Sequence, residues 1–284
     1  MSASLLPVPP GAVRRFVDVP RGPLAVLEVV VDDPAVVLVP GFTGSKEDFR
    51  HLLAPLAADG RRVVAMDQRG QHESAGPDEP DAYAVSHLAA DLLHLLDALG
   101  GRPVHLVGHS FGGLVCRHAV LEQPDAVVSL TLMCSGPEAL TGPRVELLPL
   151  LRPVLEEGGM PALVEALAAI EADDPRAQSM PPDVQAFLRE RMLASVPGAL
   201  LGMAEGLTGE PDRVDELRAT GVPLLVLHGA ADDAWSPAVQ AEMAERLGAR
   251  YVVVPDAMHS PAVENPAPTA RAMSAFFADV ESAR

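Results

Sequence analysis

The sequence contains no long apolar run and no recognisable export signal, and these two absences bear on its location. No apolar stretch approaches the roughly eighteen residues that a membrane-spanning helix requires, so we expect no membrane insertion. The segment from Met1 to Val13 has no basic region followed by an apolar stretch, which argues against a secretory signal. The expected location is therefore the cytoplasm.

Positive charge is also scarce. The formal net charge is −18, and Lys46 is the one lysine in the chain. Such a chain repels the phosphates of nucleic acids and the headgroups of anionic lipids. We therefore expect neither nucleic acid nor a membrane as a partner, and we interpret the charge as that of a soluble surface.

Cysteine is rare in this chain, and its two cysteines lack the spacing of metal ligands. For Cys116 and Cys134, a cytoplasmic setting favours buried free thiols over a disulfide. The two cysteines do not have Cys-x-x-Cys spacing. We therefore predict no metal site and no cofactor.

What the sequence does contain is an alternation of short apolar runs and helical patterns. A chain of 284 residues suits one large α/β domain or a domain with one insertion. Continuous apolar strands separated by helices indicate an α/β fold with a mostly parallel central sheet covered by helices on both faces. The expected strands span residues 26–31, 36–39, 63–66, 104–107, 127–133, 224–227 and 251–254, and the expected helices span residues 48–59, 87–99, 114–122, 236–247 and 267–280.

The stretch 138–220 breaks this alternation. It has no convincing strand and is rich in Leu, Ala, Met and Pro, with helical spacing at Leu163, Leu167 and Ile170. We predict a helical cap inserted over the site, in a core domain made of residues 1–137 and 221–284. The alternative is a helical connection that only packs on the body, and the oligomeric state stays open.

The motif Gly108-His109-Ser110-Phe111-Gly112-Gly113 lies between an expected strand and an expected helix. A serine in Gly-x-Ser-x-Gly in that setting is typical of a nucleophile elbow. Glycines at 108 and 112 leave room where side chains would collide with neighbouring elements. The sequence therefore predicts that Ser110 is a nucleophile exposed at the carboxyl edge of the sheet.

A serine hydroxyl needs a base, and the base needs a carboxylate that orients it. His259 follows the last expected strand, in a loop that can reach the carboxyl edge of the sheet. The acid is expected after the strand 224–227, where Asp232 and Asp233 stand side by side. We favour Asp232, and the choice between the two stays open.

An oxyanion hole needs two N–H donors aimed at one point. Phe111, which directly follows the serine, supplies the first donor. The second is expected from the loop after the strand 36–39, where Gly41 permits a tight turn and Phe42 offers its N–H.

Taken together, these residues make the chain resemble the α/β-hydrolase fold superfamily, within its cap-bearing serine esterase and lipase-like group. The resemblance covers roughly residues 13–280 and implies, in chain order, an oxyanion loop, a structural loop, a nucleophile elbow, an acid and a base. The motifs that carry it are Pro40-Gly41-Phe42, Asp67-Gln68-Arg69-Gly70, Gly108-His109-Ser110-Phe111-Gly112-Gly113, Gly229-Ala230-Ala231-Asp232 and His259.

Some residues depart from the pattern of that superfamily or lie beside its motifs. His72 replaces the second glycine of Asp-x-Arg-Gly-x-Gly-x-Ser, and we expect a structural or surface role for it. A serine in place of an aspartate nucleophile argues against epoxide hydrolases and haloalkane dehalogenases. We expect His109 to point away from the nucleophile, His228 to be structural, and Trp235 to lie in the core or at the rim of the site.

The leading functional expectation is a serine hydrolase that cleaves an ester, or a thioester, of a small to medium apolar molecule. The same triad also serves C–C bond hydrolysis, amide cleavage, acyl transfer and cofactor-free peroxidase chemistry, because a fold does not determine a function. A non-catalytic ligand-binding protein on this fold is a third reading, which an intact triad disfavours. The Met- and Leu-rich stretch favours an apolar pocket.

Overall fold

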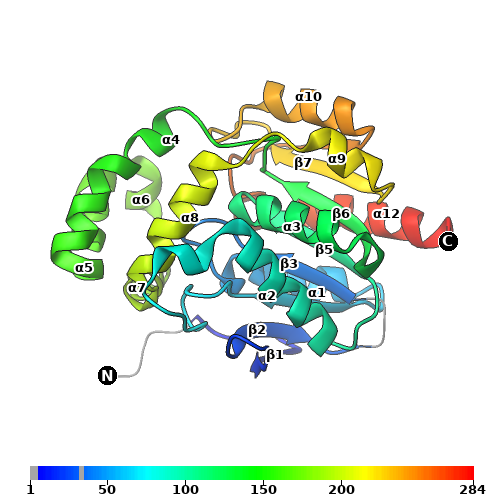
Figure 1. Ribbon diagram of the computed structural model, residues 1–284, viewed down its shortest axis with the longest axis horizontal. Helices are drawn as coiled ribbons and strands as arrows, with labels where there is room; N and C mark the ends of the chain where they lie inside the picture. Colours follow the sequence, from blue (N-terminus) through cyan, green and yellow to red (C-terminus); the bar gives the residue numbers. More distant parts are fainter. Residues whose placement is uncertain (1–5, 32–34) are drawn as a thin grey trace.

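The computed structural model describes residues 6–31 and 35–284 of the chain. Two short segments lie outside the described residues. Residues 1–5 belong to the segment that we examined for a secretory signal, and residues 32–34 belong to the expected core domain. Eight strands form one sheet in the order β1-β2-β4-β3-β5-β6-β7-β8 (Figure 1). The strand β2 is antiparallel to both β1 and β4, and every other neighbouring pair is parallel. The predicted mostly parallel sheet is confirmed.

The bounds of the elements follow the alternation seen in the sequence. The strands are β1 (Ala12–Val17), β2 (Leu24–Val29), β3 (Ala35–Val39), β4 (Arg62–Met66), β5 (Val104–His109), β6 (Val127–Met133), β7 (Leu224–Gly229) and β8 (Arg250–Val254). The helices are η1 (Lys46–Phe49), α1 (Arg50–Ala57), η2 (Pro80–Tyr83), α2 (Val85–Ala98), α3 (Phe111–Glu122), η3 (Pro124–Ala126), α4 (Pro143–Glu146), α5 (Leu148–Glu171), α6 (Pro175–Ser179), α7 (Pro182–Ala194), α8 (Pro197–Gly209), α9 (Val214–Ala219), α10 (Pro237–Leu247), α11 (Pro261–Glu264) and α12 (Pro266–Ser282).

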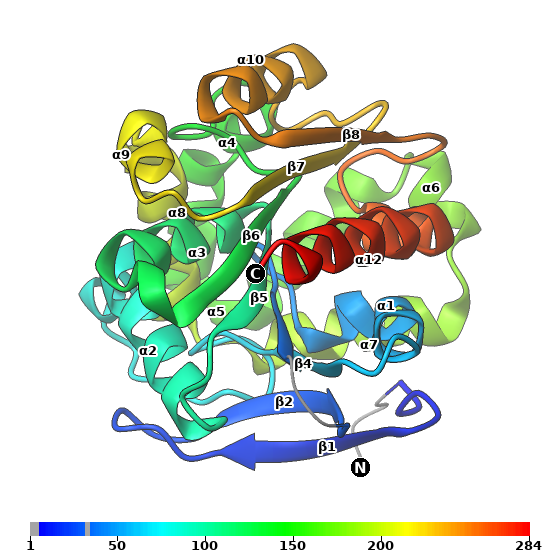
Figure 2. The same ribbon diagram turned by 90° about the vertical axis from the view of Figure 1, so that its right-hand side faces the viewer.

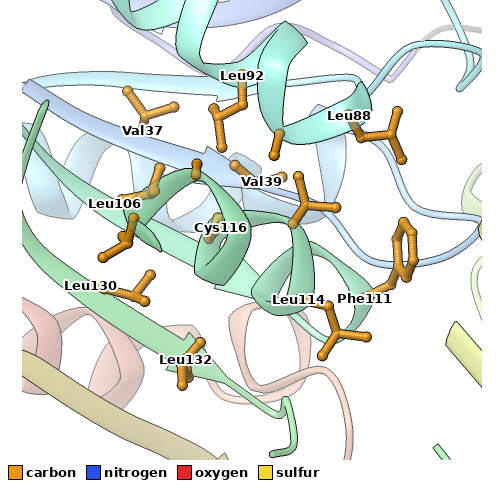
Figure 3. Close-up of a cluster of buried hydrophobic side chains, with 14 of the residues drawn as sticks. Val37, Val39, Leu88, Leu92, Leu106, Phe111, Leu114, Cys116, Leu130 and Leu132 are labelled. Carbon is orange, nitrogen blue, oxygen red and sulfur yellow. The ribbon is translucent and has the colours of Figure 1, made fainter. Parts of the chain in front are cut away.

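Helices cover both faces of the sheet, as Figure 2 shows with α2 and α3 on one side and α1 and α12 on the other. Side chains alternate between these faces along each strand. On β3, Val37 and Val39 belong to the apolar cluster beneath α2 and α3, whereas Val36 and Leu38 belong to the cluster beneath α1 and α12. Figure 3 shows the first cluster, in which Leu106 of β5 lies among side chains of α2 and α3. Two buried faces explain why the strands are continuously apolar.

The helices α4 to α9 all come between β6 and β7, so the predicted helical insertion is present. Figure 1 shows α4, α5, α6 and α7 at one end of the molecule, with α8 leading back to the body. The inserted helices have a small apolar cluster of their own, made of Leu155, Met160, Leu163 and Leu200. The boundaries at residues 137 and 221 stay a prediction, and α9 packs beside α3 and α10 of the body.

Several details differ from the sequence-based expectations. The edge strand β1 was not predicted, because Arg14 and Arg15 interrupt its apolar pattern and Val13 and Phe16 are exposed. The strand expected over residues 26–31 begins at residue 24 and ends at residue 29. The helix expected over residues 48–59 is a short 3₁₀ turn followed by α1.

The two cysteines are both buried and free, as expected. Among the residues that the structure describes, no helix combines the length and apolar character needed to cross a bilayer.

Candidate active site

Ser110 lies on a strained turn between β5 and α3. Its φ of 53° and ψ of −122° fall in a region that residues with side chains rarely adopt. The Ser110 N–H donates to the carbonyl oxygen of Met133 at 2.8 Å, which ties the turn to the end of β6. Backbone strain of this kind costs on the order of 1–3 kcal/mol and persists only where surrounding structure enforces it.

The glycines that flank Ser110 are required by close packing. A methyl group added at Gly108 would lie 2.5 Å from the carbonyl oxygen of Gly112. A methyl group at Gly112 would lie 2.5 Å from the carbonyl oxygens of Val39 and Pro40. The start of α3 therefore contacts the end of β3 directly, which brings the loop after β3 close to the serine.

His259 joins the serine to a carboxylate. Its Nε2 lies 3.0 Å from Ser110 Oγ, and its Nδ1 lies 2.9 Å from Asp232 Oδ1. The three side chains come from the turn after β5, the loop after β7 and the loop after β8, all at the carboxyl edge of the sheet. The structure thus brings together the three residues that the sequence singled out.

Asp232 is buried and accepts hydrogen bonds at both carboxylate oxygens, whereas Asp233 is exposed. Its Oδ1 also accepts the Ala234 N–H at 3.0 Å, and its Oδ2 accepts Gln240 Nε2 at 2.8 Å. Burial alone would raise the pKa of Asp232, but the hydrogen bond to His259, with the other donors, holds this pKa below its usual value. Asp233 instead forms an exposed ion pair with Arg144 of α4 at 2.6 Å. The geometry therefore favours Asp232 over Asp233.

His109 takes part in the site in a way that the sequence did not reveal. We expected its side chain to point away from Ser110, and the structure shows that it packs against His259, with 5.1 Å between the two ring centroids. Its Nε2 lies 2.7 Å from the backbone carbonyl oxygen of His259, and since a carbonyl only accepts, Nε2 carries the proton. Burial, together with the neighbouring His259, lowers the pKa of His109 to about 4. A neutral His109 thus supports the loop that carries His259.

The loop after β3 lies against the serine. A methyl group added at Gly41 would lie 3.0 Å from the Cβ of Ser110, so only glycine allows this approach without displacement. Within the described part of the chain, neither the Phe42 N–H nor the Phe111 N–H donates to a protein acceptor. Unpaired backbone donors are rare away from bulk water, so both N–H groups are suited to bind a ligand atom.

The loop after β4 holds the loop after β3 in place. Gln68 Nε2 donates to the Pro40 carbonyl oxygen and Gln71 Nε2 donates to the Gly41 carbonyl oxygen, each at 2.8 Å. Further along the loop, the Lys46 N–H donates to Asp67 Oδ1 and Lys46 Nζ to Asp67 Oδ2, each at 2.7 Å. The resemblance implied a structural loop at Asp67-Gln68-Arg69-Gly70, but it did not predict the partners of these side chains.

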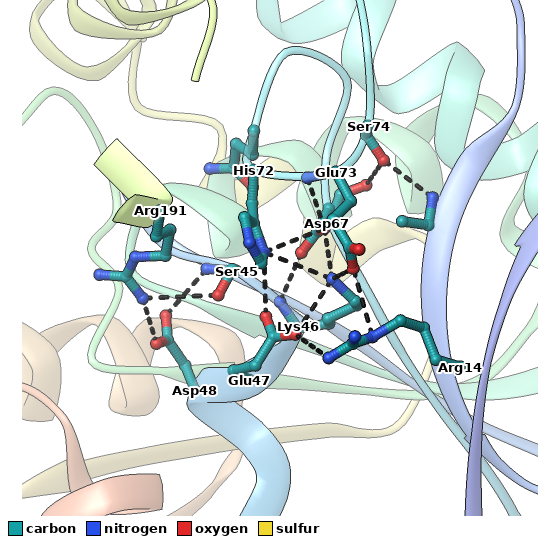
Figure 4. A network of polar contacts seen from close by, with 12 residues as sticks. Arg14, Ser45, Lys46, Glu47, Asp48, Asp67, His72, Glu73, Ser74 and Arg191 are labelled. Carbon is teal, nitrogen blue, oxygen red and sulfur yellow. Dashed lines mark hydrogen bonds and ion pairs between the residues drawn. The ribbon is translucent and has the colours of Figure 1, made fainter. Parts of the chain in front are cut away.

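Figure 4 shows that Lys46 belongs to a polar cluster that also contains His72. The Lys46 ammonium lies 2.6 Å from Glu73 and 3.1 Å from Glu47, and His72 Nδ1 lies 3.3 Å from Glu47. The His72 ring also meets Phe187 of α7 edge-on, with 5.5 Å between centroids. His72 thus has a structural place between the body and the inserted helices.

Among the residues that the structure describes, two groups of side chains bring together the atom types that bind metals. One comprises Glu47, His72 and Glu73, and the other His109, Cys134 and His259. In the first, the two carboxylates already pair with the Lys46 ammonium and the Arg14 guanidinium. In the second, both ring nitrogens of His259 are engaged by Ser110 and Asp232. Neither donor set therefore supports a resident metal ion.

Two further residues from the sequence analysis have structural positions. Trp235 is 4% exposed, its Nε1 donates to the Glu138 carbonyl oxygen at 3.3 Å, and a methyl group at Gly136 would overlap its ring. His228 Nε2 lies 2.7 Å from the Tyr251 hydroxyl, between β7 and β8. Both agree with the core and structural roles that we expected.

A serine held on a strained strand-to-helix turn, at the carboxyl edge of such a sheet, is the arrangement found in α/β hydrolases. The chain belongs to the alpha/beta hydrolase family, whose model matches residues 36–272.

Comparison with individual proteins agrees with this family. The chain is 38% identical over 97 residues to Epoxide hydrolase 2 of Siraitia grosvenorii, a match that covers 34% of this chain and only 31% of that relative. A carboxylesterase structure from Nitrososphaera gargenis superposes with a TM-score of 0.79 at 22% identity, covering 95% of this chain and all of that one. A thermophilic esterase from Thermogutta terrifontis superposes with a TM-score of 0.76 at 24% identity. The match covers 95% of this chain and 99% of that one. At these identities the structural likeness shows the fold.

Proposed function

We propose that the protein is a serine hydrolase that cleaves carboxylic esters, or thioesters, of small to medium apolar molecules. The observation that carries the proposal is the continuous hydrogen-bonded chain from Ser110 through His259 to Asp232. Ser110 is the nucleophile, His259 is the general base and acid, and Asp232 fixes the tautomer of His259 and stabilises its protonated form.

The proposed reaction has two halves. Ser110 Oγ bonds to the carbonyl carbon of the ester while His259 Nε2 takes the hydroxyl proton, and the N–H groups of Phe42 and Phe111 bind the oxyanion. The C–O bond to the leaving alcohol then breaks, and His259 returns the proton to that alcohol. Water next attacks the acyl-enzyme and gives a proton to His259. Release of the acid restores the Ser110 hydroxyl.

Apolar side chains beside the site support an apolar substrate. Phe42, which carries a proposed oxyanion donor, packs both on the main core cluster and on the apolar cluster of the inserted helices. That second cluster includes Met160, and Met192 packs against it. Methionine adapts to ligands of varied shape. The inserted helices are therefore proposed to act as a cap that lines an apolar acyl pocket.

Location is a further part of the proposal. Two buried free thiols are usual in a reducing compartment, which supports the cytoplasm.

The test is hydrolysis of p-nitrophenyl esters, from acetate to a long acyl chain, by the wild type and by Ser110→Ala. We expect activity in the wild type with an optimum at short to medium chains, and loss of essentially all of it in the variant. A fluorophosphonate should add to Ser110 in the wild type only, as judged by mass spectrometry. Circular dichroism of Ser110→Ala provides the control for folding.

The alternatives give different results in the same experiment. Covalent labelling of Ser110 without ester turnover would replace ester hydrolysis by amide cleavage, C–C bond hydrolysis, acyl transfer or cofactor-free peroxidase chemistry. Ester turnover that survives in Ser110→Ala would remove Ser110 as the nucleophile. Neither labelling nor turnover would favour a ligand-binding protein.

A further inference from the structure

We infer that Gln71 is a positioning residue for the oxyanion hole, acting through the peptide bond between Gly41 and Phe42. The inference rests on the proposed function, since it concerns the Phe42 N–H as the donor to the oxyanion. Gln71 lies in the loop after β4, whereas Phe42 lies in the loop after β3, and we do not expect Gln71 to touch the substrate.

The planar peptide bond between Gly41 and Phe42 couples the direction of its carbonyl to the direction of its N–H. A trans peptide is planar, so its C=O and N–H bonds point in opposite directions. Gln71 Nε2 donates to the Gly41 carbonyl oxygen at 2.8 Å. The hydrogen bond from Gln71 holds the Gly41 carbonyl in one direction. Because the peptide is planar, it thereby also fixes the opposite direction, along which the Phe42 N–H points.

The Gln71 amide is itself held in one orientation. Its Oε1 accepts the Gln68 N–H at 3.1 Å, which directs the NH₂ group toward Gly41. The side chain is 3% exposed, and its Nε2 also lies 3.9 Å from Met203 Sδ of α8. A buried amide with its oxygen end and its nitrogen end both engaged has little freedom to turn.

The local backbone shows why an external support is needed. Gly41 lies against Ser110 and lacks a side chain that could anchor the peptide. Thr43 has a φ of 60°, in the left-handed region. The one backbone support of this carbonyl is the turn bond from the Gly44 N–H to the Gly41 oxygen at 3.1 Å, considering the residues the structure describes. Gln71 adds a second, shorter bond.

Hydrogen bonding to the carbonyl also strengthens the donor. Donation to a peptide oxygen polarises the amide, so that its N–H becomes a better donor, and this effect is larger away from water. Gln71 thus contributes both direction and polarity to the Phe42 N–H. The contribution is felt most when negative charge develops on the substrate oxygen, which is in the transition state.

Gln68 offers a matched control, because it makes the same kind of contact one peptide earlier. Its Nε2 donates to the Pro40 carbonyl oxygen at 2.8 Å, and it is 2% exposed. The N–H of that peptide belongs to Gly41, which is not a proposed oxyanion donor. The backbone N–H of residue 68, which orients Gln71, is kept when the side chain is changed.

The experiment compares Gln71→Met and Gln68→Met in the full-length protein. Both should lower thermal stability to a similar extent. With the best p-nitrophenyl ester, Gln71→Met should lower kcat about 10- to 100-fold, below the loss of about 10²- to 10³-fold for removal of a whole oxyanion donor, with KM changed less than about threefold. Gln68→Met should keep kcat within about threefold.

Two further readouts separate positioning from general loop damage. An alkyl trifluoromethyl ketone, which adds to the serine and forms an oxyanion, should bind Gln71→Met more weakly by the same factor as the loss in kcat/KM. The ¹⁵N–H resonance of Phe42 should shift in Gln71→Met and stay close to its wild-type position in Gln68→Met. Gln71→Glu, which keeps the shape but places a carboxylate oxygen against Gly41, should be at least as impaired.

The outcomes distinguish this inference from the proposed function. A wild type that neither hydrolyses the esters nor binds the ketone would overturn both. An active wild type in which the two methionine variants lose kcat equally, or in which Gln71→Met loses none, would overturn the role of Gln71 alone.

Discussion

Arg191 of α7 and Asp48 of η1 form an ion pair in which Arg191 Nη1 lies 2.6 Å from Asp48 Oδ1. Arg191 Nη1 also approaches Ser45 Oγ at 3.5 Å. The pair links an inserted helix to the segment that directly follows the loop carrying Phe42. Because the two side chains are only 12% and 25% exposed, water screens their attraction less than it screens a surface pair.

Removing this ion pair should loosen α7. In Arg191→Met, most of the aliphatic stem is kept while the charge is lost, and we expect a loss of about 1 kcal/mol in local stability, near the upper limit for exposed pairs. Amide hydrogen exchange in α7 should then speed up about fivefold. Arg152→Met is the control, because Arg152 pairs with Glu156 and Glu205 within the inserted helices at the surface. Unchanged exchange in α7 of Arg191→Met would show that the apolar contacts alone hold this helix.

Asp232 and Asp233 are adjacent in sequence and differ in their surroundings, so they make a natural pair of variants. Asp232→Asn keeps the shape of the side chain but favours the wrong tautomer of His259, which we expect to lower kcat by about 10³- to 10⁴-fold. Asp233→Asn removes only the exposed ion pair with Arg144 and should keep kcat within about twofold. The measurement is steady-state hydrolysis of the best p-nitrophenyl ester by folded variants. A greater loss in Asp233→Asn would reverse the assignment of the acid.

The close contact between α3 and β3 makes Gly112 intolerant of any side chain. In Gly112→Ala, the new methyl group would meet the carbonyl oxygens of Val39 and Pro40 at 2.5 Å, which the rigid strand can relieve only by moving. We expect a loss of about 1–3 kcal/mol in unfolding free energy, the usual cost of overpacking. Gly209, at the end of α8, has nothing within 4 Å of its added methyl group. Urea denaturation should therefore find Gly209→Ala as stable as the wild type or more so.

The sequence predicted the parts of the site that local motifs encode. The glycines around Ser110 mark a sharp turn, and the position of His259 after the last strand follows from the chain order of the elements. Because parallel strands end at one edge of the sheet, these residues meet without any further information.

The sequence could not predict the contacts that Gln71 and His109 make around the site, and the reason is physical. Gln71 contacts a carbonyl thirty positions away, and His109 contacts one 150 positions away. Each contact joins a side chain to a backbone oxygen, and since every residue has such an oxygen, the partner leaves no signature in the sequence. The strand β1 was missed for a different reason: an edge strand with exposed Val13 and Phe16 and two arginines between them lacks clean alternation.

His105 should make folding stability depend on pH. Burial lowers its pKa from 6.5 to about 4, although Glu281 opposes this shift. Its Nδ1 lies 2.7 Å from Ser129 Oγ, its Nε2 lies 3.0 Å from Glu281 Oε1, and its ring packs on Phe277. The neutral imidazole fits these contacts, with Nε2 donating to the carboxylate and Nδ1 accepting from the hydroxyl.

The direction of this pH dependence follows from where the folded and the unfolded chain bind a proton. Between pH 6.5 and about 4 the unfolded chain binds a proton at His105 and the folded chain does not, so the stability that His105 contributes is complete above pH 6.5 and is lost as the pH falls. The loss is at most about 1.4 kcal/mol per pH unit. In His105→Gln this dependence disappears, so the wild type should be the more stable protein at pH 7 and its advantage should shrink toward pH 4.5. Urea denaturation across this range measures the difference, and the Cε1–H resonance of His105 reports its titration directly. An advantage that stays constant with pH, or a titration midpoint near 6.5, would contradict a buried neutral histidine at this position.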